Sequence, residues 1–72
     1  MKDIVKKFGR NLRRIREKRK LTQQELSDEI GVDKTYIGKI ERGERSPSLS
    51  VIQEVARALD ISIKSLFDFD EN

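Results

Sequence analysis

Apolar residues recur every three or four positions along most of this chain, which is the spacing of one face of an α-helix. In residues 4–18 they are Val5, Phe8, Leu12 and Ile15, and in residues 48–59 they are Leu49, Ile52, Val55, Ala56 and Leu59. Only "EIGVD" and "RGERSPS" interrupt the pattern as turns would. The spacing therefore predicts an all-α fold of about five short helices, the last near residues 62–67, with both apolar sets buried.

Length and composition limit the chain to one small domain, residues 1–72. The sequence has no Cys and no His, which removes disulfides, the usual zinc sites, the commonest general base and serine-type triads. We therefore expect no metal, no cofactor and no enzyme activity. The longest apolar run is too short to cross a membrane, and "MKDIVKKFGRN" has no apolar core of a secretory signal. A cytoplasmic protein is expected.

The net charge of +3 conceals a strong asymmetry along the chain. Residues 1–20 hold ten Lys or Arg and two Asp or Glu, a charge of +8, whereas residues 21–72 hold six and eleven, a charge of −5. A concentrated positive charge of this kind suits a polyanionic partner. It equally suits a solvated helix face that keeps the protein soluble, so charge alone does not decide between the two interpretations.

The centre of the sequence has the marks of two short helices joined by a tight turn. "TQQE" is a capping box, in which the Thr22 hydroxyl and the Glu25 carboxylate each bond the other residue's backbone amide. Gly31 suits the position just past a helix end, and Asp33 suits the cap of the next helix. Residues 22–42 are therefore predicted to form a helix-turn-helix unit.

The second helix of this unit has two contrasting faces. Ile37 and Ile40 share one face, and Thr35 and Lys39 lie nearly opposite them. A polar outer face without a central acidic residue, beside a basic first helix, is typical of a helix that enters the DNA major groove. Gly38 flanks this face, where a missing side chain would let DNA approach the backbone closely. Similar helix corners also occur in proteins that bind no nucleic acid.

The stretch "LTQQELSDEIGVDKTYIGKIERGERSPS" resembles the Cro/C1-type helix-turn-helix family of phage repressors and bacterial regulators. The resemblance extends from "LRRIREKRKLTQQEL" to "VARALDISIKSLF", and "DKTYIGKIERGER" is most similar to small controller proteins of restriction–modification systems and to short repressors of mobile elements. It implies a five-helix, lambda-repressor-like domain with a central helix-turn-helix. It also implies a transcriptional regulator that binds an inverted repeat in double-stranded DNA as a homodimer.

The resemblance also implies which residues would read base edges. Lys34 could donate to guanine, and Thr35 could contact a thymine methyl or a base edge. An acid near phosphates is unfavourable, so we interpret Asp33 chiefly as a helix cap. The implied base-reading positions are Asp33, Lys34, Thr35 and Lys39.

A second set is implied to contact the DNA backbone. Gln23 matches the family glutamine that bonds a phosphate and braces the first base-reading residue. Tyr36 has two readings, as a phosphate contact or as a half-buried ring over the helix corner. The implied backbone contacts are Gln23, Tyr36, Arg42, Arg45 and, on the first helix, Arg13, with Arg10 as an alternative there because the sequence does not orient that helix.

An internal ion pair and a subunit interface are also expected. Arg16 and Glu41 match an internal ion pair of the family that ties the first helix to the recognition helix. The C-terminal end carries more large apolar groups than one short helix can hide, so residues 48–67 are expected to serve both the core and a dimer contact. The expected interface residues are Ile61, Ile63, Leu66, Phe67 and Phe69.

Two rival interpretations remain open at this stage. An antitoxin-like or adaptor protein-interaction module would use the basic first helix to bind an acidic protein. A membrane-surface protein would use the same helix as a basic amphipathic helix, but its apolar stripe would then have to leave the core. No small-molecule ligand is expected under the DNA-binding interpretation.

Overall fold

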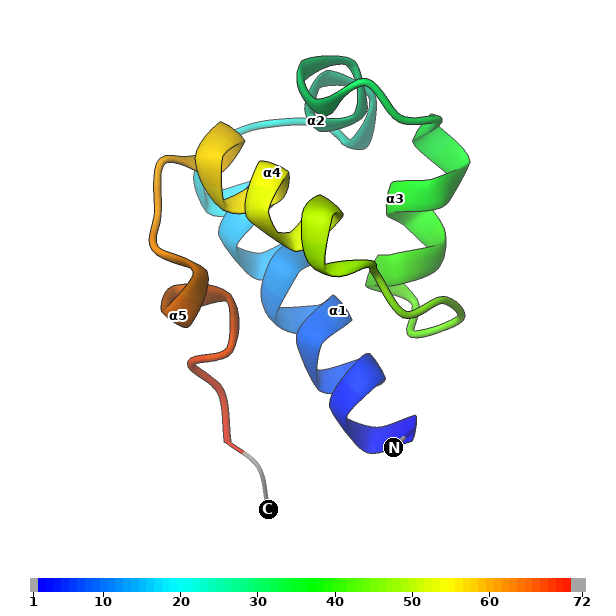
Figure 1. Cartoon of the computed structure of the whole chain (residues 1–72), viewed down its shortest axis with the longest axis vertical. Coiled ribbons are helices and arrows are strands. Elements are labelled where there is room, and N and C mark those ends of the chain that lie inside the picture. Colours follow the sequence, from blue (N-terminus) through cyan, green and yellow to red (C-terminus); the bar gives the residue numbers. More distant parts are fainter. Residues whose placement is uncertain (1, 71–72) are drawn as a thin grey trace.

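The computed structural model describes residues 2–70, and these residues form helices and loops without a strand (Figure 1). The helices are α1 (Lys2–Lys18), α2 (Gln23–Ile30), α3 (Lys34–Glu41), α4 (Leu49–Leu59) and α5 (Ile63–Leu66). The predicted all-α, five-helix fold is therefore confirmed. None of the described helices combines the length and the apolar character needed to cross a membrane.

Local capping chemistry sets the helix boundaries. Both bonds of the capping box are present at α2, where the Glu25 amide donates to Thr22 Oγ1 over 3.0 Å and the Thr22 amide donates to the Glu25 carboxylate over 2.9 Å. Gly31 ends α2 in the left-handed conformation, with φ of 77°. Ser48 caps α4 by accepting from the Val51 amide over 3.2 Å. These caps satisfy backbone groups that a helix end would otherwise leave unpaired.

The core lies where α1 packs against α3 and α5, and where α2 packs against α3 and α4. Its buried apolar side chains come from all five helices: Phe8, Leu12, Ile15, Leu26, Ile37, Ile40, Ile52, Val55, Ala56, Leu59 and Leu66. Most members of the two periodic sets are therefore buried as predicted. Because α2, α3, α4 and α5 have only 8, 8, 11 and 4 residues, this shared core and not intrinsic helix propensity holds the fold together.

Two apolar residues depart from the expected positions. Leu49, placed in the buried stripe of its helix, is 85% exposed because it is the first residue of α4 and lies beyond the edge of the core. Leu66, expected at a subunit interface, is fully buried in the core of the chain itself. Leu66 of α5 therefore completes the core of the chain and presents no surface to a partner subunit.

A glycine with no predicted role allows the closest approach between α1 and α3. Gly9 is buried, and a Cβ built on it would collide with the Ile40 carbonyl oxygen and lie only 2.8 Å from the Glu41 carbonyl oxygen. Both groups are backbone atoms of α3, so they cannot rotate away as a side chain could. Gly9 therefore fixes how closely the two helices pack.

We predict that Gly9→Ala destabilises the protein although alanine favours helices. Overpacking costs about 1–3 kcal/mol, which outweighs the roughly 1 kcal/mol of helix propensity that alanine gains. Gly38→Ala is the matched control, because the nearest atom to its added Cβ is the Arg42 guanidinium nitrogen at 3.0 Å, the end of a flexible side chain. Urea unfolding should show a loss for Gly9→Ala and a gain or no change for Gly38→Ala; equal effects would contradict this account.

Candidate nucleic-acid interface

The turn between α2 and α3 directs the start of α3 outward. The amides of Gly31 and Val32 both donate to the Ser27 carbonyl, over 2.8 and 3.0 Å. Asp33 then caps α3 by accepting from the Thr35 amide over 2.9 Å. The predicted helix-turn-helix unit is therefore present, and its second helix begins at a defined point on the surface.

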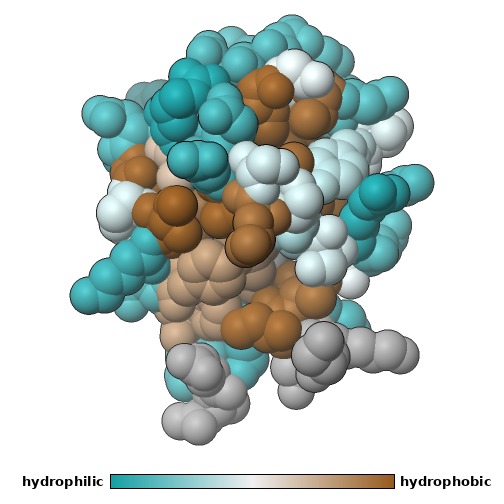
Figure 2. Space-filling model, viewed as in Figure 1, coloured by the Kyte–Doolittle hydropathy of each residue, from teal (hydrophilic) through white to brown (hydrophobic). Residues whose placement is uncertain are grey.

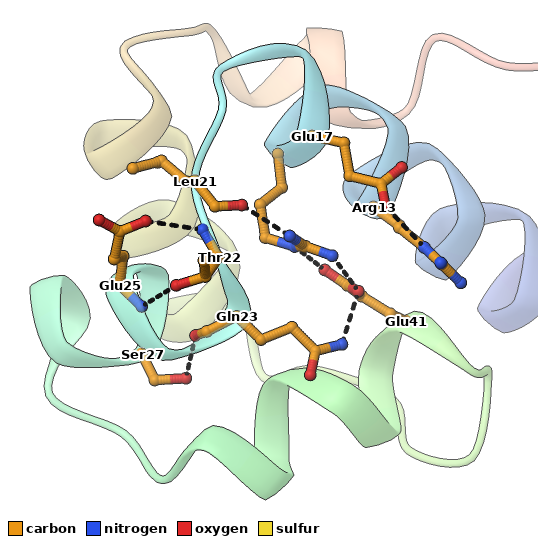
Figure 3. A network of polar contacts seen from close by, with 9 residues as sticks. Arg13, Glu17, Leu21, Thr22, Gln23, Glu25, Ser27 and Glu41 are labelled. Carbon is orange, nitrogen blue, oxygen red and sulfur yellow. Dashed lines mark hydrogen bonds and ion pairs between the residues drawn. The ribbon is translucent and has the colours of Figure 1, made fainter.

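A buried polar network joins α1, α2 and α3 beneath this unit (Figure 3). Arg16 donates to both carboxylate oxygens of Glu41, over 2.6 and 3.0 Å, and to the Leu21 carbonyl over 2.6 Å. The side chains of Arg16 and Glu41 are only 8% and 2% exposed. Gln23 adds a hydrogen bond from its amide nitrogen to Glu41 over 2.9 Å. The ion pair that the resemblance implied is thus present and extends to α2.

The geometry of the pair compensates for its burial. Hydrogen bonding to Glu41 is the largest cause of the raised pKa of Arg16, and it outweighs the opposing effect of burial. A buried ion pair stabilises a fold only when its remaining polar groups are also bonded. Here both carboxylate oxygens have donors, and no buried side-chain nitrogen or oxygen of the described residues lacks a partner.

Gln23 and Gly38 meet beside this network. The ideal Cβ position on Gly38 lies 3.5 Å from the Gln23 side-chain oxygen and 3.0 Å from the Arg42 guanidinium. Gly38 is buried beneath these groups, so the expectation that it lets DNA approach the backbone is corrected. It instead gives room to two side chains that were expected to contact the DNA backbone. The link from Gln23 to Glu41 was also missed, because no spacing in the sequence indicates it.

The implied base-reading residues are exposed at the N-terminal end of α3 and about one turn further along the helix. Asp33, Lys34, Thr35 and Lys39 are all exposed. The carboxylate of Asp33 accepts from both the amide and the hydroxyl of Thr35, over 2.9 and 3.0 Å. These bonds, the amide first, lower the pKa of Asp33. Asp33 is therefore the cap that we expected, and the Thr35 hydroxyl keeps its lone pairs as acceptors.

Cationic residues flank α3, and two of them have acidic neighbours. Arg42 pairs with Glu44 over 2.8 Å, which raises the pKa of Arg42 and lowers that of Glu44. Arg13 pairs with Glu17 over 3.2 Å on the exposed side of α1. Exposed pairs of this kind are weak and can exchange their carboxylate for a phosphate. Both cations therefore remain available to a polyanion.

Tyr36 of α3 is in contact with Arg45, which lies in the loop after α3. The Arg45 guanidinium lies 5.1 Å from the centre of the Tyr36 ring, within range of a cation–π contact. Tyr36 is half-buried and packs against the core, which is one of its two predicted readings. The contact orients Arg45 without neutralising it.

The C-terminal apolar residues divide into exposed and covered members. Ile63 and Phe67 are exposed, and Ile61 and Phe69 are half-buried against the core. The Phe67 ring lies 5.0 Å from the Phe8 ring. Figure 2 shows apolar side chains gathered over the face that Figure 1 presents. A groove of about 80 Å³ is lined by Ile4, Val5, Phe8, Ser46, Pro47, Ile52 and Phe67.

Residues 12–66 match the helix-turn-helix family HTH_3. The chain belongs to that family. The predicted resemblance to Cro/C1-type regulators is confirmed, and the chain is a helix-turn-helix regulator.

Several relatives of the chain are controller proteins of restriction–modification systems. The chain is 41% identical to control protein C.BamHI of Bacillus amyloliquefaciens over 63 residues, which cover 86% of this chain and 78% of that protein. The crystal structure of the restriction–modification controller C.AhdI from Aeromonas hydrophila superimposes with a TM-score of 0.85 at 43% identity, over 88% of this chain and 96% of that one. The controller C.Esp1396I, solved as a tetramer with its 35-base-pair operator, gives a TM-score of 0.80 at 26% identity, over 90% and 86%.

We predict that Glu41→Gln lowers the free energy of unfolding by about 3–5 kcal/mol, because it leaves the buried Arg16 guanidinium without its carboxylate. Glu44→Gln is the matched control, since it removes the carboxylate of an exposed pair and should change stability little. Urea unfolding of both variants measures the difference. Similar losses from the two substitutions would show that the buried pair contributes no more than the surface pair.

Proposed function

We propose that this protein regulates transcription by binding a specific inverted repeat in double-stranded DNA as a homodimer. The observation that carries the proposal is the exposed polar face of α3, held in place by the Arg16–Glu41–Gln23 network. The controller C.Esp1396I, which is similar in fold, was solved on its operator. C.Esp1396I is a controller of a restriction–modification system. We infer that this protein also controls such a system.

The chemistry of α3 suits direct reading of bases in the major groove. Lys34 can donate to guanine, Thr35 can offer its acceptor or its methyl, and Lys39 lies about one turn further along the helix. Asp33 serves chiefly as the cap that fixes the first turn of α3. The base-reading face is therefore short, which matches a regulator that needs two copies of it.

Backbone contacts would surround this short face. Arg42 and Arg45 lie at the C-terminal end of α3, and Arg13 lies on α1. The amide nitrogen of Gln23 is held by Glu41, so its second N–H is the group that we assign to a phosphate. Such contacts fix the register of the protein on DNA and depend strongly on salt.

The second subunit is assigned to the apolar face of Figure 2. Leu49, Ile63 and Phe67 are exposed, Phe67 also lines the groove, and the lining of the groove is mainly apolar. A second copy would cover these groups through a two-fold axis. The two copies of α3 would then lie about 34 Å apart, one turn of DNA. Ile61 and Phe69 would contribute only their exposed edges.

We predict that Lys34→Ala and Thr35→Ala relax base preference at one or two positions, at a cost of about 1–3 kcal/mol for each good contact. Gln23→Ala is the matched comparison and should weaken binding to preferred and scrambled sites alike. Selection of bound sites from random duplex DNA, followed by titration of each variant, measures both effects. Equal losses on preferred and scrambled sites for Lys34→Ala would contradict the base-reading assignment. Weak binding without any selected motif would favour the protein-interaction alternative.

We also predict that Leu49→Lys and Ile63→Lys lower the sedimentation mass of the dimer while leaving the helix content intact. Both side chains are exposed in the single chain, so folding does not require them. A charge buried at the contact would oppose association. Lys64→Ser, also on α5 but already polar, serves as the control. An unchanged mass for both lysine variants would place the subunit contact on another face.

A further inference from the structure

A second concave surface lies on the side of α1 that the DNA-binding proposal does not use. It is a cleft of about 350 Å³ between α1 and the segment after α5, lined by Lys7, Arg10, Asn11, Arg14, Phe69 and Asp70. In Figure 1 this segment descends from α5 toward the N-terminal half of α1. The volume falls within the range of small-molecule sites.

Three cations of the cleft form one stripe along α1. Lys7, Arg10 and Arg14 are spaced by three and four residues, so their side chains lie on neighbouring turns of the same face. Among the described residues that line the cleft, three are cationic and Asp70 is the only acidic one. The cleft therefore has an excess of positive charge.

A buried amide orients one of these cations. Arg14 donates to Asn11 Oδ1 over 2.8 Å. Asn11 is only 5% exposed, and its nitrogen donates to the carbonyls of Ser65 and Leu66 over 3.1 and 2.8 Å. The guanidinium is thus held by a side chain that is itself fixed to α5. A cation positioned before binding loses less conformational entropy when a ligand arrives.

The cleft faces away from the recognition helix. Gly9 and Arg16 mark the side of α1 that contacts α3. At about 100° per residue, Arg10, Arg14 and Lys7 lie roughly 100–160° around the helix from Gly9. An anion in the cleft would therefore not occupy the surface that we assign to base reading.

We propose that this cleft binds a phosphate group, with the guanidinium groups of Arg10 and Arg14 and the Lys7 ammonium as donors. Guanidinium groups match phosphate oxygens in charge and geometry. The half-buried ring of Phe69 supplies an apolar wall against which the rest of the ligand can pack. The volume admits a nucleotide, and the open side also admits a phosphate of a nucleic-acid backbone. The site would revise the expectation that the chain takes no small-molecule ligand.

The test titrates the full chain at low salt with pyrophosphate, with ATP and with a duplex of random sequence. The signals are calorimetric heat and chemical shifts of the cleft residues. Arg10→Gln and Arg14→Gln should each weaken phosphate binding roughly tenfold, as expected for a hydrogen bond to a charged group. Lys6→Gln is the matched control, because it removes one charge from the other flank of the same helix, where Lys6 lies against Gly43. Arg10→Gln leaves the Arg14–Asn11 bond intact, so this variant also guards against misfolding caused by the loss of that bond.

The outcomes separate the sources of the phosphate. Binding of pyrophosphate or ATP that Arg10→Gln weakens and Lys6→Gln does not supports a free phosphate ligand. The same pattern with the duplex alone supports a backbone phosphate. Equal weakening by Lys6→Gln, or no response from any probe, overturns the site. No operator sequence is used, so this result is independent of the proposed function.

Discussion

The position of α3 depends on the ion pair between Arg16 and Glu41. An isolated helix of eight residues is too short to be stable in water, and α3 contributes only two large side chains, Ile37 and Ile40, to the core. The orientation of its exposed face must therefore come from elsewhere. Glu41 supplies it, since its carboxylate is bonded from α1 by Arg16 and from α2 by Gln23. One residue thus fixes α3 to both of its neighbours.

Gly9 and the ion pair act at the same corner. The missing side chain of Gly9 brings the backbone of α1 against the carbonyls of Ile40 and Glu41, and Arg16 lies two turns further along the same side of α1. Close packing of the two helices is what lets the guanidinium reach both carboxylate oxygens. A wider separation would leave a buried charge partly unpaired, which is far more costly than an ordinary packing defect. Steric fit and charge pairing therefore support each other here.

The sequence predicted the features that depend on local chemistry. The caps at Thr22, Asp33 and Ser48 follow from short-range hydrogen bonding, and the apolar spacing identified most of the core. It could not predict which neighbour each face meets. Leu49 shares the period of the buried stripe but lies beyond the end of the core, and Gly9 has meaning only once α3 lies against it. Periodicity defines a face, whereas burial depends on where the next helix ends.

The same distinction applies to the charged residues. The sequence showed a strongly positive first helix and left open whether it served a polyanion or solubility. The fold divides these cations between two flanks of α1. Arg13 lies toward α3 and pairs with Glu17, whereas Arg10 and Arg14 lie along a cleft in which Asn11 already positions one guanidinium. Cations that only maintained solubility would gain nothing from a buried amide at their base. Under the two proposals above, the positive charge of α1 divides into two surfaces, one for the DNA backbone and one for the phosphate of the cleft.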